Sequence, residues 1–185
     1  KKYSDKIGIE FMTSPYSPKI VDEINTYVKA IKIGSGDITW IDIIKKIAKK
    51  RKIGIIATGA SSLDEVKKAA KEYLKINKSL VIMQCNTNYT GDKDNIKFTN
   101  LNVLKQYKKI FPKIILGLSD HTFGHVTVLG AITLGARVIE KHFTDNNNRV
   151  GPDHFFAMNP ISWKEMIKAS RELESALGAG VKKIE

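Results

Sequence analysis

Two histidines stand at the ends of apolar runs that resemble β-strands. His121 follows a run that begins at Ile114, and His142 follows a run that begins at Arg137. In both places aliphatic residues give way, within three or four positions, to charged and hydroxyl-bearing residues. Parallel barrels and open α/β sheets expose their functional edge at such points. A single histidine is more often a hydrogen-bonded core residue, but two in the same context predict an enzyme site.

The chemistry that these residues could perform starts from a metal ion and a carboxylate. Two imidazoles on adjacent strand ends are able to hold a divalent metal, which polarises a carbonyl oxygen without proton transfer. Imidazole ligands alone suit zinc or iron as well as other metals. Glu140 lies two residues before His142, so on a strand both side chains point to the same face. The carboxylate of Glu140 is then able to orient the ligand shell or to move a proton.

Six apolar runs along the chain are expected to be the strands that position these residues. Most are continuous rather than alternating, which is typical of strands covered on both faces. The expected strands are Ile7–Met12, Ala30–Ser35, Ile53–Thr58, Leu80–Cys85, Ile114–Ser119 and Arg137–Phe143.

Amphipathic segments with recognisable ends separate the runs and are expected to be helices. Helix starts are predicted at Ser17, which precedes a proline, at Ser62, which forms a capping box with Glu65, and at Ser162. Gly135 is expected to end the helix before the last strand.

Alternating strands and helices indicate an α/β fold with a parallel sheet and right-handed crossovers. Six strand–helix units fit a TIM (β/α)8 barrel that lacks its first two βα units, and residues 1–185 are expected to form this single partial domain. An open doubly wound sheet is the alternative, but Met12–Pro15 after the first run is not a glycine-rich phosphate loop. The unpaired edges of an incomplete barrel would need a partner chain or a swapped segment to cover them.

Composition favours a cytoplasmic protein with neither a membrane nor a nucleic-acid partner. No run approaches the roughly 18 apolar residues of a membrane helix, and no signal peptide is recognised. Cys85 is the only cysteine, which agrees with a reducing compartment. The net charge of +12 would suit nucleic acid, but the lysines are spread along helical faces, as in Lys45–Lys52. We therefore expect a small anionic substrate instead.

The order of motifs resembles the sialic acid synthase family over most of the chain, from Ile9 to Gly178. The motifs that carry the resemblance are Phe11–Pro15, Lys32–Gly36, Thr58–Gly59, Ser119–Thr122 with Gly124, Gly135–Ala136, Ile139–Thr144 and Gly151–Asp153. The resemblance implies a TIM barrel that condenses phosphoenolpyruvate with an N-acetylmannosamine-type sugar. The products would be a nonulosonic acid and phosphate. It also implies a homodimer and a divalent metal, with Mn²⁺ preferred over Mg²⁺ or Co²⁺, bound by His121 and His142.

The same resemblance assigns roles to further residues. Phosphoenolpyruvate would be bound by Ser14, Lys32, Ser35 and Ser119, because a lysine supplies a charge and hydroxyls supply directional donors to a phosphate. Acids of the family correspond to the catalytic candidates Glu140 and Asp37, and sugar contacts correspond to Tyr89 and Asp153.

Several departures from the family pattern indicate a divergent member with a different sugar or weakened activity. Asp37 replaces the usual glutamate, Ala57 replaces a serine, and Gln84 with Thr87 replaces a histidine and an asparagine. No counterpart of the family's first two barrel units or of its C-terminal antifreeze-like domain is found in the sequence. A legionaminic acid, pseudaminic acid or 9-phosphate synthase, a metal-dependent aldolase, and a non-catalytic barrel remnant used for binding or assembly all remain alternatives.

Overall fold

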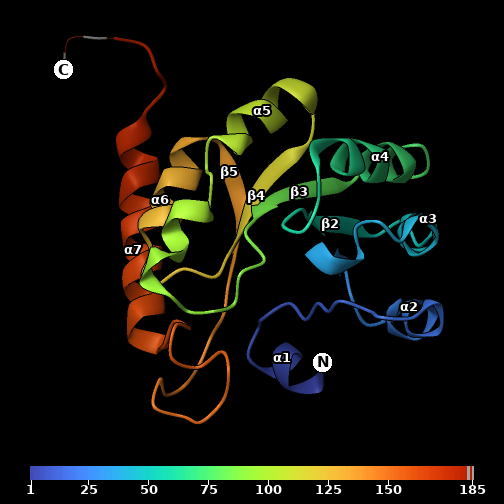
Figure 1. Cartoon of the computed structure of the whole chain (residues 1–185), viewed down its shortest axis with the longest axis horizontal. Coiled ribbons are helices and arrows are strands. Elements are labelled where there is room, and N and C mark those ends of the chain that lie inside the picture. Colours follow the sequence, from blue (N-terminus) through green and yellow to red (C-terminus); the bar gives the residue numbers. More distant parts are fainter. Residues whose placement is uncertain (183, 185) are drawn as a thin grey trace. The chain divides into compact units, whose positions relative to one another are not determined.

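The computed structural model describes residues 1–182 and 184, and it divides the chain into two compact units. The first unit contains Lys1–Cys85 with Lys113–Ile115, and the second contains Asn86–Pro112 with the chain from Leu116 onward. Figure 1 follows the chain through both units. Residues 183 and 185 of the expected domain 1–185 lie outside the described residues. In the described part, no helix is long and apolar enough to span a bilayer.

The first unit is built around three parallel strands. In the register of the sheet, β1 pairs with β2 and β2 pairs with β3. The side chains of Ile31, Ile56 and Ile82, one from each strand, are almost completely buried. The elements are α1 (Lys2–Lys6), α2 (Pro18–Ile24), β1 (Ala30–Ile33), the 3-10 helix η1 (Ser35–Asp37), α3 (Ile41–Lys49), β2 (Ile53–Ala57), α4 (Leu63–Leu74) and β3 (Leu80–Cys85).

The second unit contains two parallel strands and the longest helix of the described chain. Helix α7 packs along α6 in Figure 1, and both helices contribute to a core of Val128, Ile132, Met158 and Met166. The elements are the 3-10 helix η2 (Lys93–Phe98), α5 (Val103–Ile110), β4 (Ile115–Asp120), α6 (Val126–Thr133), β5 (Ala136–Lys141) and α7 (Pro160–Leu177).

A register shift marks the pairing of β4 with β5. Leu116 lies opposite Ala136, but the next residue, Gly117, lies opposite Val138, so Arg137 is the extra residue of a β-bulge. Such a bulge lets two residues of one strand face one residue of its neighbour. Beyond the bulge the pairing is regular and brings Ser119 opposite Glu140.

Five of the six expected strands are confirmed, with ends that move by at most two residues. The interpretation of Ile7–Met12 as a strand is wrong, since none of these residues belongs to a strand, and an isolated bridge to Ile31 is formed only by the next residue, Thr13. Gly8 adopts a positive φ of 74° and the side chain of Ile9 is 61% exposed. An apolar run needs a covering layer to form a buried strand, and within the first unit this run has none.

Two of the three predicted helix starts are confirmed by their caps. Ser17 accepts a hydrogen bond from the Ile20 amide, and Ser62 forms the capping box with Glu65. The third prediction is wrong, because α7 begins three residues earlier, with Asn159 as its N-cap and Ser162 as the third helical residue. An asparagine followed by a proline is itself a strong start signal, so the sequence contained the correct answer. Gly135 follows α6 with a φ of 99°, as expected of a residue that ends a helix.

Close packing of α4 against β2 depends on one glycine and one tyrosine. A Cβ atom built on Gly54 would lie 2.4 Å from Cζ of Tyr73, so no larger residue fits without displacing the ring. The Tyr73 hydroxyl donates to the carbonyl of Lys52 at 3.0 Å and accepts from Nδ2 of Asn77 at 3.0 Å. Burial raises the pKa of Tyr73 to about 12. The neutral phenol is therefore part of the folded structure.

We expect the chain to lose stability at alkaline pH through this tyrosine. The unfolded phenol has a pKa of about 10, so folding favours the protonated form and up to about 3 kcal/mol is lost as the pH rises from about 10 to 12. Urea unfolding at increasing pH measures this loss. Near neutral pH, the free energy of unfolding should be about 1 kcal/mol higher for the wild type than for Tyr73→Phe, because the variant lacks two hydrogen bonds. The gap should narrow above pH 10. A constant gap, as expected for the exposed control Tyr3→Phe, would contradict this prediction.

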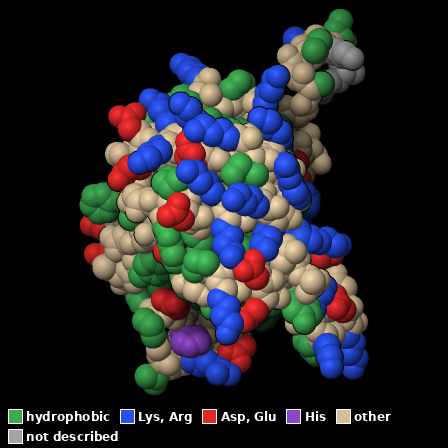
Figure 2. All heavy atoms as spheres, turned by 90° about the vertical axis from the view of Figure 1, so that its right-hand side faces the viewer, with side chains coloured by type: hydrophobic (Ala, Val, Ile, Leu, Met, Phe, Trp, Pro, Cys, Tyr) green, Lys and Arg blue, Asp and Glu red, His purple; other side chains and the backbone are tan. Residues whose placement is uncertain are grey.

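Basic side chains cover much of the surface without forming a single patch. On the face shown in Figure 2, lysine and arginine side chains are spread over most of the area, with acidic side chains between them. Many of the basic side chains form ion pairs with acids. Lys46 and Lys50, for example, both pair with Asp22. This mixture matches the expectation of solvated helical faces.

Candidate active site

His121 and His142 lie side by side in the second unit. His121 is the first residue after β4 and His142 is the first residue after β5. Because the two strands are parallel neighbours, their carboxyl ends bring the two imidazoles together, with ring centroids 5.1 Å apart and an interplanar angle of 68°. The strand-end placement predicted for both residues is thus observed, and the site is built from this pair outward.

A hydrogen bond from the segment after β3 fixes the His121 ring. Nδ1 of His121 lies 2.7 Å from the carbonyl oxygen of Asn86. A carbonyl only accepts, so Nδ1 carries the proton and Nε2 retains its lone pair. Burial lowers the pKa of His121, and the nearby His142 acts in the same direction, whereas the bond to Asn86 opposes them. The neutral imidazole with a free Nε2 is the form that binds metals.

His142 is held by later residues of the loop that follows β5. Its carbonyl accepts a hydrogen bond from the amide of the buried Met158 at 2.9 Å. Its Nδ1 lies 3.4 Å from Oδ2 of Asp153, in the same loop. Asp153 thus brings a carboxylate close to this imidazole.

Aromatic rings surround the two imidazoles. The Tyr89 ring centroid lies 4.2 Å from that of His121 and 5.5 Å from that of His142, although the Tyr89 side chain is 46% exposed. On the other side, the buried Phe156 lies 5.2 Å from His142. Sequence reasoning selected Tyr89 but not Phe156.

Ser119 and Glu140 come together beside the histidines. They face one another across β4 and β5, and the Ser119 hydroxyl donates to Oε1 of Glu140 at 3.0 Å. Ser119 is 2% exposed, whereas Glu140 is half-buried. A residue assigned to the phosphate and a residue assigned to acid–base chemistry are therefore directly bonded.

Asn86 and Asn95 are functional candidates that sequence reasoning missed. The buried Asn95 accepts from Nδ2 of Asn86 at 2.8 Å and donates to the carbonyl of Asn88 at 2.6 Å. These bonds shape the loop that presents the Asn86 carbonyl to His121 and places Tyr89 against it. Asn86 is the first residue after β3, which is the signal that could have identified it, whereas Asn95 lies within η2 and has no such signal.

The loop that bears Asp153 is fastened at several points of the second unit. Asn147 donates to the carbonyls of His154 and Ala157, each at 2.8 Å. Gly91, with a φ of 61°, lies so close to Phe155 that a Cβ atom would approach its ring to 2.0 Å. Asp153 is thus carried on a braced loop, with its own side chain 47% exposed.

The remaining predicted residues belong to the first unit. Lys32 lies in β1, and its amide donates to the carbonyl of Thr13, the residue before Ser14. Ser35 and Asp37 are in η1, directly after β1, with Ser35 only 7% exposed. Lys32, Ser35 and Asp37 therefore lie at or just after the carboxyl end of β1. Ser14 lies in the segment that is bridged to this strand.

The protein ligands in the second unit fit a metal site built on two imidazoles. Nδ1 of His121 is hydrogen-bonded to a carbonyl, so its Nε2 has a lone pair to offer, and Nδ1 of His142 lies near the Asp153 carboxylate. Among residues 1–182 and 184, no group of three or more His, Cys, Asp or Glu side chains is arranged to hold a metal ion. If the two histidines bind a metal, water or substrate oxygen would complete the shell.

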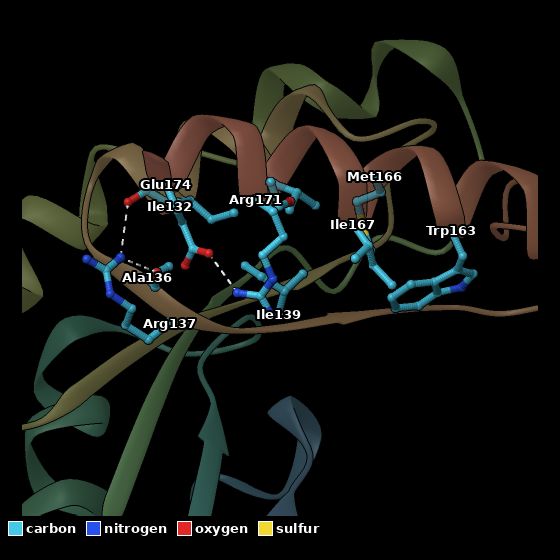
Figure 3. A pocket seen from close by; sticks show the side chains of 11 residues that line it. Ile132, Ala136, Arg137, Ile139, Trp163, Met166, Ile167, Arg171 and Glu174 are labelled. Carbon is cyan, nitrogen blue, oxygen red and sulfur yellow. Dashed lines mark hydrogen bonds and ion pairs between the residues drawn. The ribbon is translucent and has the colours of Figure 1, made fainter. Parts of the chain in front are cut away.

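A separate groove of about 200 Å³ lies between α7 and β5 (Figure 3). Its walls are mainly apolar, with an ion pair between Arg171 and Glu174 at one side. It contains none of the predicted site residues. Ile139 lines the groove, whereas the adjacent Glu140 alternates to the other face of β5.

Comparisons with known proteins agree with the motifs. The NeuB family matches residues 1–182. The chain is 36% identical to N,N'-diacetyllegionaminic acid synthase of Campylobacter jejuni, over 98% of this chain and 54% of that protein. It is 31% identical to human N-acetylneuraminate-9-phosphate synthase, over 100% of this chain and 51% of that protein.

A solved structure has a similar fold. The crystal structure of N-acetylneuraminic acid synthetase from Leptospira borgpetersenii matches with a TM-score of 0.92 and 25% identity, over 100% of this chain and 64% of that one. The chain spans about half the length of the curated relatives it matches.

Proposed function

Because the chain belongs to the NeuB family, we propose that it is the catalytic part of an enzyme that condenses phosphoenolpyruvate with an N-acylated hexosamine. The reaction consumes one water molecule, and its products are a nonulosonic acid and phosphate. The observation that carries the proposal is the cluster of His121, His142, Ser119 and Glu140 at the ends of two paired strands. Parallel α/β enzymes place their chemistry at this edge. The relatives differ in their sugars, so the acceptor is left as the class of N-acylated hexosamines.

The residues of the chain divide the work between two substrates. Lys32 supplies a positive charge for the phosphate and carboxylate of phosphoenolpyruvate, and the hydroxyls of Ser14, Ser35 and Ser119 supply directional donors. Asp153 accepts hydrogen bonds from sugar hydroxyls, and Tyr89 offers a ring face beside them. Each group acts by binding and orienting one reactant.

Acid–base work falls to Glu140, with Asp37 as a second acid. The bond from Ser119 orients one carboxylate oxygen of Glu140, which suits a group that transfers a proton. A divalent metal bound by His121 and His142, with Mn²⁺ preferred, would polarise the aldehyde oxygen of the sugar. The hydrogen bond that places a proton on Nδ1 of His121 supports this role, because it leaves Nε2 for the metal.

The proposal extends to the assembly and its location. We propose a TIM barrel of which this chain forms a part, in a homodimeric cytoplasmic enzyme. The edge of β5 away from β4 carries no partner strand within the second unit. Further strands supplied by the rest of the protein or by another chain would cover that edge, since exposed strand edges pair readily.

The proposal is tested by phosphate release from phosphoenolpyruvate. We expect the full-length protein to release phosphate only when both Mn²⁺ and an N-acylated hexosamine are present, and a chelator should abolish the release. Comparing N-acetylmannosamine, its 6-phosphate and a 2,4-diacetamido hexose identifies the acceptor. Release without any sugar would indicate a phosphatase, and cleavage of a sugar acid without phosphate would indicate an aldolase. No turnover with any acceptor would favour the non-catalytic barrel remnant.

A further inference from the structure

A buried ion pair lies on the face of β4 and β5 opposite the candidate active site. Asp120 and Lys141 are register partners, and Nζ of Lys141 lies 2.6 Å from Oδ2 of Asp120. Their side chains are 1% and 2% exposed, respectively. Side chains alternate along a strand, so the residues next to Asp120 and Lys141 in the sequence point to the opposite face of the sheet. Ser119 and His121 flank Asp120, while Glu140 and His142 flank Lys141.

Every oxygen of the Asp120 carboxylate is used. Oδ2 accepts from the hydroxyls of Thr127 at 2.6 Å and Thr122 at 3.0 Å, in addition to the Lys141 ammonium. Oδ1 accepts from the Thr122 amide at 3.1 Å. A charge this deeply buried is tolerated only when it is fully paired and hydrogen-bonded, and here it is.

The same network holds the peptide that follows His121. The Thr122 amide is bound by Asp120, and the Thr122 carbonyl accepts from Nζ of Lys141 at 2.7 Å. Thr127 connects the network to the first turn of α6. The backbone on the C-terminal side of His121 is thus tied to β5, one residue before His142.

We propose that Asp120 and Lys141 are positioning residues that set the separation and orientation of the two imidazoles. The geometry requires both charges, because either one alone would be buried without its partner and would draw water or rearrange. The inference rests on the proposed function in one respect, namely that the histidines are the metal-binding residues. Neither positioning residue contacts the substrates or the metal in this proposal.

The test measures histidine geometry directly as well as metal binding. In the full chain without metal, nuclear Overhauser contacts between the His121 and His142 ring protons report their separation, and long-range proton–nitrogen spectra report the His121 tautomer. In Asp120→Asn and Lys141→Met we expect the ring contact to weaken and the His121 tautomer to become mixed. Mn²⁺ affinity should fall about 10- to 100-fold, the range for residues that orient metal ligands.

The matched control is the exposed ion pair of Asp94 and Lys97, which lies in the same unit. Asp94→Asn and Lys97→Met should leave ring contacts, tautomer and metal affinity unchanged, since surface pairs contribute little. If folded Asp120→Asn and Lys141→Met behave like these controls, the positioning role is overturned. Lys141→Arg, which keeps the charge, should restore part of the metal affinity lost in Lys141→Met.

Failure to fold is covered by a double variant without buried charge. Asp120→Leu combined with Lys141→Met removes both ions together, which is far less costly than removing one. If this variant folds and keeps the ring contact and Mn²⁺ affinity, the ion pair has no positioning role. If it folds and loses them, the proposal is supported. Turnover is not needed for either reading, so a wild type that is inactive on every sugar would disprove the proposed function while the geometry test still stands.

Discussion

Replacing either His121 or His142 by alanine is expected to lower metal-dependent condensation by about 100-fold or more, because changes even in residues that support metal ligands cost 10- to 100-fold. In the proposed metal site each imidazole is one of the two ligands assigned to the protein, so the loss of either should be severe. Folding should be retained, since both residues stand just after their strands rather than within the sheet. Phosphate release at saturating Mn²⁺ and calorimetric titration of the metal would measure the two losses separately.

His125 is the matched control for these substitutions. It precedes α6 and makes no side-chain cap hydrogen bond to that helix. His125→Ala should therefore retain activity within about twofold, as should His154→Ala apart from a stability cost of about 1 kcal/mol for its bond to Thr144. Undiminished metal binding in both His121→Ala and His142→Ala would rule out the proposed metal site.

Replacing Lys32 by alanine is expected to raise the KM for phosphoenolpyruvate by about 10- to 100-fold, because the charge that binds the phosphate is lost. The KM for the sugar should change little, since Lys32 is assigned to only one reactant. Asp153→Ala should produce the opposite pattern, with the sugar affected by a similar factor.

Steady-state kinetics that vary each substrate in turn would measure both effects. Lys32→Arg serves as the control that keeps the charge, and Asp153→Asn keeps a hydrogen-bond acceptor without the charge. Equal damage to both substrates in Lys32→Ala and Asp153→Ala would show that the two binding roles are not separate. In Asp153→Ala, the contact with His142 is also lost, so metal affinity should be recorded alongside.

The sequence predicts the buried strands well, but the strand that it predicts in the first apolar run is wrong. The prediction for β3 has the observed ends because Leu80–Cys85 is apolar at every position except Gln84, and every one of its residues is buried. The run from Ile7 to Met12 is also largely apolar, but most of its side chains are exposed and only the residue after it, Thr13, forms a bridge. Apolar composition indicates that a segment can be buried and says nothing about whether a partner is present.

Sequence patterns identify the site residues that follow the strand ends. They do not identify the buried residues on the opposite face of the same strands. His121 and His142 were identified because their chemistry is visible in the sequence. Asp120 and Lys141 occupy the adjacent positions, yet the motif gave no indication that both are buried. A physical signal was nevertheless present: if His142 faces the site, Lys141 must face the other side of a sheet covered on both faces, and a lysine there needs a buried anion.

The bulge at Arg137 makes the consequences of a one-residue change in chain length depend on where that change falls. Deleting Arg137 would remove the extra residue and still leave Val138 opposite Gly117 and Glu140 opposite Ser119. Deleting Ile139 instead would place an odd number of residues between the bulge and the site, turning Glu140 and His142 toward the opposite side of the sheet. Natural length variation should therefore be found at the bulge and be absent between it and His142.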